Sequence, residues 1–282
     1  MNVQFRNLVK KPYLLVFLNG FMLASLCYFQ MERSYENQLY SAIKQSIDSR
    51  LDTDDTQDSL LVKTMHTCYT MMNNRADVFG PEDLTGFKMN YLHPTSVDLM
   101  TAKGACGSYS VVLARMLKAA NFDVRVAQMK ANGIYAAHNV VEVQSNTGWV
   151  VLDPTYDVYF TKPNGTLAGF MDVSRDWDYY KKQVPATYDL AYRYEDVRYT
   201  NWTKIPLVSS GMKGALNLVM GRAAADKVSV RTWFLNVYTV CYYVFLFLYI
   251  PVFLMTVRRF MRSTVSFSTA ERRRVWFGTS AR

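Results

Sequence analysis

Two long stretches without a charged side chain, one toward each end of the chain, limit what it can fold into. The first covers residues 12–30 and the second covers residues 233–257. A helix needs about 20 apolar residues to cross a hydrocarbon core roughly 30 Å thick, and both stretches reach or approach that length. We therefore expect a transmembrane helix in each stretch and a separate domain over residues 31–232.

Other interpretations of these stretches stay open on the sequence. Either stretch also suits the buried core helix of a soluble protein. The first follows basic residues, as the apolar part of a cleaved signal peptide does. However, it ends in Leu26-Cys27-Tyr28-Phe29, which lacks the small residues of a good cleavage site, and Leu26 is too bulky for the position before a lipoprotein cysteine. We therefore favour an uncleaved anchor.

Basic residues flank both stretches on the sides nearest the chain ends. Seven arginines follow the second stretch, against Glu271 as the one acid there. Before the first stretch there is no acid, and there are three basic residues, Arg6, Lys10 and Lys11. The flank richer in Lys and Arg stays in the cytoplasm. We therefore expect segments 1–11 and 258–282 to be cytoplasmic at an inner or plasma membrane, and the domain between the spans to be periplasmic or extracellular.

The distribution of charge argues against nucleic acid as a partner. The formal net charge is +9, but the two flanks hold ten of the 32 basic residues and one of the 23 acidic residues. The rest of the chain therefore carries equal numbers of both signs and has no basic excess to neutralise phosphates. The partner that the two apolar stretches predict is a lipid bilayer.

The four cysteines are too few to form a disulfide framework. Cys27 and Cys241 fall in the apolar stretches, which leaves Cys68 and Cys106 for the domain. A bridge between those two is one interpretation. In the other, Cys68 belongs to the core and Cys106 is a free thiol.

Apolar residues at helical spacing predict helices over residues 35–51, 60–72, 109–120 and 211–222. The first of these continues the first apolar stretch outward, and the last lies on the membrane surface or packs on its own domain. His66 lies off the apolar stripe of its helix, so we expect it to be exposed. The segment 80–104 is rich in turn residues, and Cys106 falls at or just before the first turn of the next helix.

Alternation of β-branched and polar residues predicts strands over residues 122–129, 137–144 and 149–152, with a turn at 145–148. The last two strands then form an antiparallel hairpin. Paired positions count outward equally from the turn, which places His138 across from residues 153–155. We therefore expect His138 and Asp153 to be neighbours on one face of the hairpin.

Cys106, His138 and Asp153 are candidates for a nucleophile, its base and the group that orients the base. A cysteine attacks as the thiolate, and both a helix N-terminus and a neighbouring imidazole favour that form. The second ring nitrogen of the base needs an acceptor such as Asp153. Gly104 and Gly107 lie on either side of Cys106 and let a substrate approach the backbone closely.

Other chemistries have less support in the sequence. A cysteine at a helix start, taken alone, is more often an inert core residue. One cysteine, one histidine and one aspartate lack the paired spacing of zinc ligands, and we expect no metal. We also find no phosphate-binding or dinucleotide-binding fingerprint and expect no cofactor.

The segments GACGSYSVVLARMLKAANFDVRVAQ and AAHNVVEVQSNTGWVVLDPTYDVYF resemble the core of the transglutaminase-like superfamily, within the papain-like group of thiol enzymes. The shared features are Gly-x-Cys at a helix start, a strand, His before Val-x-Val alternation, and Trp-Val-x-Leu-Asp-Pro, all within residues 103–160. The resemblance implies an α+β fold in which the Cys-bearing helix packs on an antiparallel sheet. It also implies acyl transfer through a thioester, with Cys106 as nucleophile, His138 as general base and Asp153 as the orienting acid.

One position departs from the pattern, because an aromatic residue is often found close after the matching histidine, whereas Asn139 follows His138 directly. This difference alters the wall of the pocket more than the chemistry. For the oxyanion we expect the backbone N–H of Cys106 to be one donor, with the side chains of Asn90 and Tyr91 as further candidates.

The function expected from these features is that of a membrane-anchored thiol enzyme. Its substrates would be amides or peptides of the cell envelope, and the reaction would be hydrolysis or transfer to an amine. The resemblance also extends to inactive domains, so the alternative is a non-catalytic binding or scaffold domain with a partner in envelope or polysaccharide assembly. A channel or transporter component has less support, because neither span contains an ionisable group.

Overall fold

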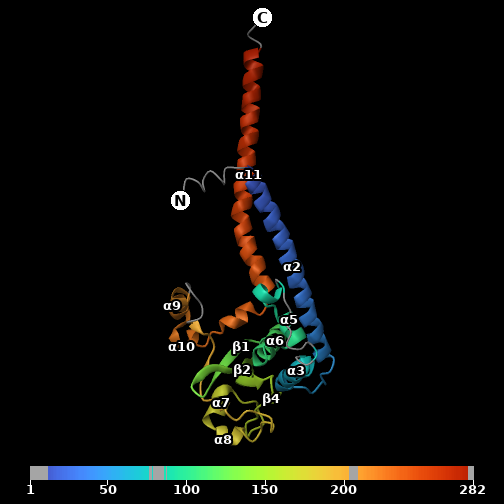
Figure 1. The fold of residues 1–282 in the computed structure, drawn as a ribbon, viewed down its shortest axis with the longest axis vertical. Coiled ribbons are helices and arrows are strands. Elements are labelled where there is room, and N and C mark those ends of the chain that lie inside the picture. Colours follow the sequence, from blue (N-terminus) through green and yellow to red (C-terminus); the bar gives the residue numbers. More distant parts are fainter. Residues whose placement is uncertain (1–11, 76–77, 79–85, 87, 203–208, 279–282) are drawn as a thin grey trace. The chain divides into compact units, whose positions relative to one another are not determined.

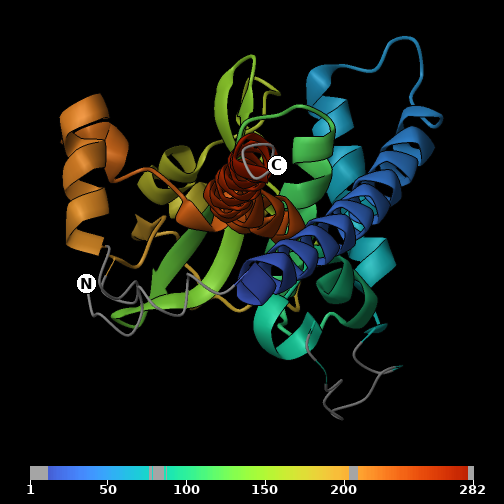
Figure 2. The ribbon, with the colours of Figure 1, turned by 90° about the horizontal axis from the view of Figure 1, so that it is seen from above.

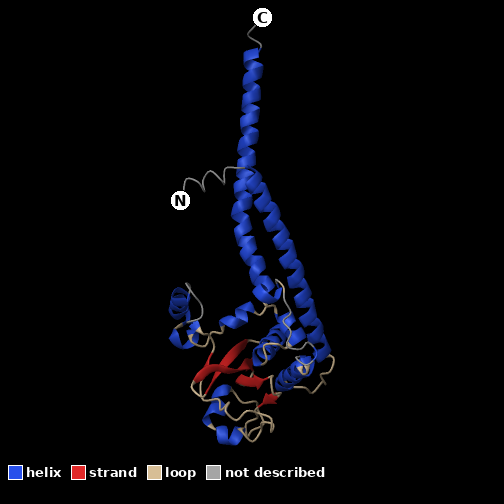
Figure 3. Cartoon of the chain, viewed as in Figure 1, coloured by secondary structure: helices blue, strands red, loops and turns tan. Residues whose placement is uncertain are grey.

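The computed structural model describes residues 12–75, 78, 86, 88–202 and 209–278. It divides the chain into two compact units, one made of Met1–Arg33 with Tyr238–Arg282 and the other of Ser34–Val237. The chain is α+β, with one sheet and two long apolar helices (Figure 3). The basic N-terminal segment 1–11 and the turn expected at Gly80-Pro81 lie outside the described residues.

Helices α2 (Pro12–Asp48) and α11 (Val237–Gly278) contain the two apolar stretches. The expected long apolar helix is present in each stretch, and both helices are long and apolar enough, by length and composition, to cross a membrane. The second helix begins four residues later than the apolar stretch does, because Trp233 lies in the 3-10 helix η3 (Val230–Phe234). Val230 and Leu235, on either side of Trp233, are buried within the unit Ser34–Val237. Their burial holds this part of the chain in a turn.

Within the first unit the two helices lie side by side and antiparallel (Figure 1). The amide of Asn19 donates to Thr256 Oγ1 at 2.7 Å, and the rings of Phe29 and Phe245 are 5.2 Å apart. A polar group in an apolar helix needs a partner of this kind, since lipid tails offer none. The start of α2 at Pro12 and the C-terminal part of α11 therefore lie toward the same end of the helix pair.

The second unit is built on a five-stranded antiparallel sheet of order β4-β3-β2-β1-β5. The strands are β1 (Val124–Ala131), β2 (Ile134–Ser145), β3 (Gly148–Asp153), β4 (Val158–Tyr159) and β5 (Val197–Arg198). Ser145 pairs with Gly148 and Val141 with Leu152, which confirms the predicted hairpin and its register. The alternation along β2 therefore decides which of its side chains face each side of the sheet.

One face of the sheet is covered by α3 (Gln57–Met72), α5 (Thr95–Thr101), α6 (Cys106–Ala119) and the last turns of α2 (Figures 1 and 2). Thr56 caps α3 by accepting a hydrogen bond from Ser59 N at 3.2 Å. Helix α5 and the π-helix η1 (Lys88–Leu92) correct the prediction of a turn-rich segment there. Helix α5 has seven residues, which make about two turns, and this length is too short for the apolar residues to show a helical period in the sequence.

The other face of the sheet is covered by aromatic side chains from the segment after β3, which includes α7 (Phe170–Arg175) and α8 (Trp177–Tyr180). Tyr194 is fully buried at the centre of this layer, and its ring lies 5.3 Å from that of Phe160 and 5.1 Å from that of Phe170. The layer is held together by ring contacts between positions far apart in the chain. Both faces of the sheet are therefore buried.

A buried charge cluster spans β1 and β2. Arg125 binds the Glu142 carboxylate through two nitrogens, at 3.0 and 3.2 Å, and Tyr199 donates its hydroxyl to the same carboxylate at 2.5 Å. The guanidinium also lies 3.9 Å from the ring centroid of Trp149. All the charge in the cluster is thus compensated by close partners.

The predicted helix over residues 211–222 is present as α9 (Ser209–Met220), which is followed by α10 (Arg222–Ala225). Leu218 and Val219 on α9 are exposed at 88% and 82%. Lys213 of α9 forms an ion pair with Asp226 at 3.0 Å, so the two helices are tied to each other.

Candidate active site

Cys106 is the first residue of α6, as the sequence predicted, and its side chain is half-buried. The residue before it, Ala105, has φ +46° and ψ −127°. This backbone region disfavours a Cβ and costs about 1–3 kcal/mol, and it is most often retained at functional sites. The strain sits at the point where the loop turns into the helix, and it presents the thiol at the electropositive helix start.

The loop before Cys106 is tied to α5 by one hydroxyl. Ser108 Oγ accepts from the backbone N–H of Gly104 at 2.8 Å and donates to Asp98 Oδ1 at 2.5 Å. Burial raises the pKa of Asp98, although the Ser108 hydrogen bond opposes that effect. Gly104, Ser108 and Asp98 therefore fix the geometry of the turn that leads into Cys106.

Gly104 is required in this turn for steric reasons. A Cβ built on Gly104 would lie 2.6 Å from Ser108 Oγ, whereas a Cβ on Gly107 meets nothing within 4 Å. We expect Gly104→Ala to displace Ser108 from Asp98 and to lower the free energy of unfolding by about 1–3 kcal/mol. Gly107→Ala is the matched control and should leave stability unchanged or raise it by up to about 1 kcal/mol through helix propensity.

The two glycine variants are compared by thermal unfolding of the full chain in detergent. A Gly104→Ala protein as stable as the Gly107→Ala protein would show that the Ser108 hydroxyl is not fixed where the structure has it.

His138 is placed on β2 by an irregularity in the strand pair. Met129 pairs with His138, but the next residue of β1, Lys130, pairs with Tyr135, so Ala136 and Ala137 form a bulge. Ala136 has φ +64°, which lies in the left-handed region. A bulge bends the strand and redirects the neighbouring side chain, and bulges are frequent beside active sites.

His138 and Asp153 meet on the aromatic face of the sheet. His138 Nε2 lies 2.7 Å from Asp153 Oδ2, and Asp153 Oδ1 accepts from the backbone N–H of Thr155 at 3.1 Å. Tyr192 stacks on the imidazole, with ring centroids 4.5 Å apart and an interplanar angle of 9°. His138 is only 2% exposed and Asp153 is fully buried. Since Nε2 is occupied by Asp153, Nδ1 is the ring nitrogen left to serve Cys106.

The pKa values of Cys106 and His138 shift in the directions that favour a thiolate beside an imidazolium. Burial lowers the pKa of His138, but the Asp153 carboxylate and the Cys106 sulfur outweigh it and raise that pKa to about 9. Burial raises the pKa of Cys106, but hydrogen bonds from His138 and Asn139 outweigh it and lower that pKa below its usual range. A thiolate beside an imidazolium is the reactive state of a thiol nucleophile.

Asn139, which the sequence assigned to the wall of the pocket, contacts the sulfur directly. Its side-chain Nδ2 lies 3.4 Å from Cys106 Sγ, and its backbone carbonyl accepts from Ser110 Oγ of α6 at 2.9 Å. Residues 138 and 139 alternate along β2, so His138 belongs to the aromatic face and Asn139 to the face that α6 covers. The amide of Asn139 is thus a candidate oxyanion donor at the position where the sequence departs from the transglutaminase-like pattern.

The other predicted site residues are placed less closely. Asn90 and Tyr91 lie on η1 with exposed side chains, and the described contacts of Asn90 do not include Cys106 or His138. Gly107 lies in the first turn of α6, next to Cys106. The four cysteines are all free, which contradicts a bridge between Cys68 and Cys106. Cys68 is buried in the core instead, because α3 directs it against the backbone of α6.

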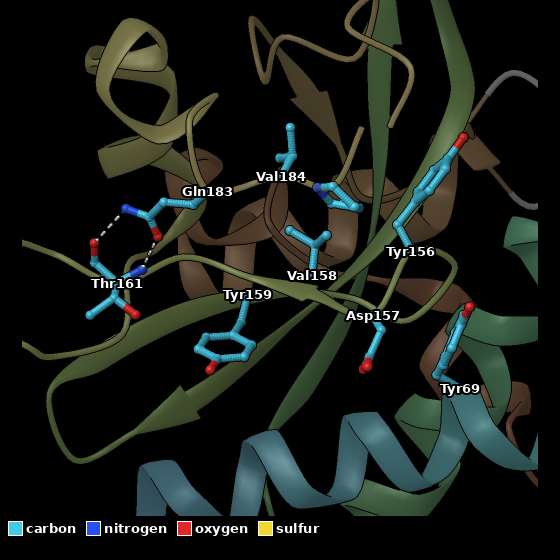
Figure 4. A pocket seen from close by; sticks show the side chains of 9 residues that line it. Tyr69, Tyr156, Asp157, Val158, Tyr159, Thr161, Gln183 and Val184 are labelled. Atoms are coloured by element: carbon cyan, nitrogen blue, oxygen red, sulfur yellow. Dashed lines mark hydrogen bonds between the residues drawn. The ribbon is translucent and has the colours of Figure 1, made fainter. Parts of the chain in front are cut away.

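A cavity of about 610 Å³ lies beside Tyr156, one of the rings that contact His138 (Figure 4). Tyr156 lines it and also contacts His138, with ring centroids 5.7 Å apart. Tyr69 from α3, Tyr159 from β4 and Val184 from the aromatic layer form other parts of the wall. The cavity is therefore a candidate pocket for the part of a substrate next to the reacting group.

Sequence reasoning missed Tyr156 and Tyr192, the two rings that contact His138. Tyr156 follows Asp153 closely in the chain, and that proximity was the available signal. Tyr192 lies 54 positions beyond His138 in a stretch that shows no period, so nothing in the sequence separates it from the other 19 tyrosines.

In the described ranges, no group of three or more His, Cys, Asp or Glu side chains is arranged to hold a metal ion. His66, the other histidine whose partner the structure gives, lies on α3 and is 67% exposed, as predicted, and its Nδ1 is 2.7 Å from Asp157 Oδ2. Comparison of the chain with protein-family models, with curated proteins and with solved structures gives no match.

Proposed function

We propose that this chain is a membrane-anchored, transglutaminase-like thiol enzyme that acts on amide or peptide substrates of the cell envelope. The observation that carries the proposal is the geometry of three side chains: Cys106 starts helix α6 and is hydrogen-bonded by His138, whose Nε2 lies 2.7 Å from Asp153 Oδ2. The pKa of the thiol is lowered and that of the buried imidazole is raised to about 9. A buried histidine in a purely structural role is usually kept neutral by its burial. Here the neighbouring groups reverse that effect, which is what acyl-transfer chemistry requires.

In the first step the Cys106 thiolate attacks the substrate carbonyl carbon, so that a C–S bond forms and the carbonyl oxygen takes up the negative charge. The backbone N–H of Cys106 and the amide of Asn139 are the donors available to that oxygen. The intermediate then collapses, the C–N bond breaks, and the His138 imidazolium gives its proton to the departing amine. A thioester on Cys106 and a neutral His138 remain.

In the second step water or another amine attacks the thioester. His138 takes a proton from the attacking group, the C–S bond breaks, and the sulfur leaves as thiolate. Asp153 holds the imidazole ring of His138 in one position, with Nε2 toward the carboxylate, through both steps. The carboxylate itself is fixed because its second oxygen accepts from Thr155 N. The thiolate and imidazolium are thereby restored.

The membrane arrangement that we propose has both termini in the cytoplasm and the domain outside it. The antiparallel packing of the two apolar helices supports this arrangement, because it brings the start of α2 and the C-terminal part of α11 to the same end of the helix pair. The basic residues near both ends support the same side for them.

The test is acylation of the full chain in detergent by p-nitrophenyl acetate, a small acyl donor that needs little recognition. We expect a stoichiometric burst of p-nitrophenolate and an acetyl group on Cys106, found by mass spectrometry after acid quench. Cys106→Ala should lose both, and Cys241→Ala, which removes a cysteine from the apolar helix α11, should keep both. A folded wild-type chain without the acetyl group on Cys106 would overturn the proposal and favour a binding or scaffold domain.

A further inference from the structure

Helix α5 is held at its N-terminus by a carboxylate from α2. Glu36 Oε1 accepts from the backbone N–H of Ser96 at 3.1 Å and from the hydroxyl of Thr95 at 3.2 Å. Pro94 occupies the N-cap position of α5, and its side chain has no polar atom to serve as a cap. Glu36 and Thr95 are buried, with exposures of 0% and 4%. Glu36 therefore supplies, from a distant part of the chain, the cap that fixes where α5 begins.

The same hydroxyl of Thr95 also contacts the segment that leads into α11. Thr95 Oγ1 donates to the carbonyl oxygen of Leu235 at 3.1 Å, and Leu235 lies two residues before α11 begins. A threonine hydroxyl has a single proton, so both acceptors must be held in place around it for this contact to form. Helix α2 and the segment before α11 thus meet at one side chain of α5.

The other end of α5 continues directly into the turn that leads to Cys106. Only residues 102–105 separate α5 from α6. Ala102 N donates to Asp98 O at 2.8 Å, and Ala105 N donates to Ala102 O at 3.1 Å. Asp98 also accepts the Ser108 hydroxyl, which ties α5 to the first turns of α6. Because this connection is short and hydrogen-bonded, a shift of α5 is passed on to Cys106.

We propose that Glu36 and Thr95 are positioning residues for the nucleophile, which set the place of α5 and thereby the angle at which Cys106 meets His138. The inference rests on the proposed function, since it concerns the regulation of the same site. The reactivity of Cys106 then depends on both chain segments that lead into the apolar helices, because each segment supplies one acceptor at Thr95. A displacement of about 1 Å at a reacting group costs up to about 100-fold in rate, so small shifts of α5 have measurable effects.

Two pairs of variants test the proposal in the full chain in detergent. Thr95→Val removes the hydroxyl and Thr95→Ser keeps it, whereas Glu36→Leu removes the acceptor and Glu36→Gln keeps an oxygen in its place. Iodoacetamide alkylates the Cys106 thiolate by forming a C–S bond and releasing iodide. We expect Thr95→Val and Glu36→Leu to lower this rate at pH 7 about tenfold and to move the pH midpoint of alkylation upward, toward that of an ordinary thiol. Thr95→Ser and Glu36→Gln should keep the wild-type rate and midpoint.

Thr64→Val is the matched control, because Thr64 is a buried threonine whose hydroxyl donates within its own helix, to Leu60 O at 2.7 Å. Rates are measured well below the unfolding temperature of each variant, so that lost stability alone does not lower them. A folded Thr95→Val chain with the wild-type rate and midpoint would overturn the positioning role, whether or not Glu36→Leu folds. An equal loss in Thr64→Val, or a failure of Thr95→Ser and Glu36→Gln to keep reactivity, would also overturn it. A wild-type Cys106 that does not react with iodoacetamide would overturn the proposed function instead.

Discussion

Replacing His138 by alanine is expected to slow the alkylation of Cys106 by iodoacetamide at pH 7 by about 100-fold or more. Without the imidazolium, burial raises the pKa of the half-buried thiol with only Asn139 left to oppose it, and each unit of increase removes nine-tenths of the thiolate. Acetylation by p-nitrophenyl acetate should fall by about 10²–10⁴-fold, as is typical when a general base is lost.

The wild type and His138→Ala should also differ in how their reaction rates change with pH. In wild type the pKa of Cys106 is lowered, so the thiolate should persist to a lower pH than that of an ordinary thiol, and alkylation should stay fast as pH rises. Amide turnover also needs the proton on His138, so it should decrease as pH passes about 9. In His138→Ala the alkylation rate should instead rise about tenfold per pH unit through the alkaline range.

His66→Ala is the control for the loss of a histidine. His66 is exposed on α3 and pairs with Asp157, so its removal should leave the pH profile of Cys106 unchanged. If the His138→Ala and wild-type profiles coincide, the imidazolium does not support the thiolate and the proposed pairing is wrong.

The second large effect is a loss of stability when the buried charge cluster of Arg125, Glu142 and Tyr199 is broken. We expect Glu142→Ala to lower the free energy of unfolding by about 3–5 kcal/mol, because it leaves the guanidinium of Arg125 buried without its carboxylate. Side-chain exposure is 12% for Arg125 and 3% for Glu142, so water replaces little of what is lost. Tyr199 also loses the acceptor of its hydroxyl.

Two comparisons make this stability experiment specific. Lys118 and Asp123 form an exposed ion pair at 3.1 Å, and Asp123→Ala should cost less than about 1 kcal/mol. The double variant with Arg125→Met and Glu142→Leu should be more stable than Glu142→Ala, since no charge is then left unpaired. Denaturant unfolding of the full chain measures all three, and a loss below about 1 kcal/mol for Glu142→Ala would contradict the cluster.

The contact between His138 and Asp153 could be predicted because it depends on the register of one hairpin, which is counted from its turn. The turn at 145–148 fixes the register of two strands that are adjacent in the chain, and the period of two then decides which residues share a face. The start of α6 at Cys106 could be predicted for a similar reason, since its apolar residues repeat over three turns. The transglutaminase-like identity of the core stays a prediction.

The bulge before His138 could not be predicted. Residues 136 and 137 are both alanine, and neither is the glycine that would indicate a positive φ. The irregularity arises in the pairing of β1 with β2, outside the β2–β3 hairpin whose register the sequence predicts. Ala105 is a similar case, because alanine gives no sign of its left-handed backbone. In both places the tertiary structure imposes a conformation that the local residue disfavours.

The aromatic layer was also missed, for a different reason. Rings such as Tyr156 and Tyr192 are brought to His138 from separate loops, so no spacing in the chain records the contact. The sequence showed that tyrosine is abundant after Asp153 but could not show which rings would be central. Long-range packing of this kind appears only when the chain is folded.

Tyr192 lies flat against the imidazole of His138 and, with Tyr156, leaves that ring 2% exposed. Bulk water therefore has little access to the ring, and Nε2 is already held by Asp153. The route by which a proton can leave runs through Nδ1, on the side of Cys106. In the proposed reaction a bound substrate would block that route, so the proton that the thiol gave up would be retained and delivered to the leaving amine before solvent could exchange it.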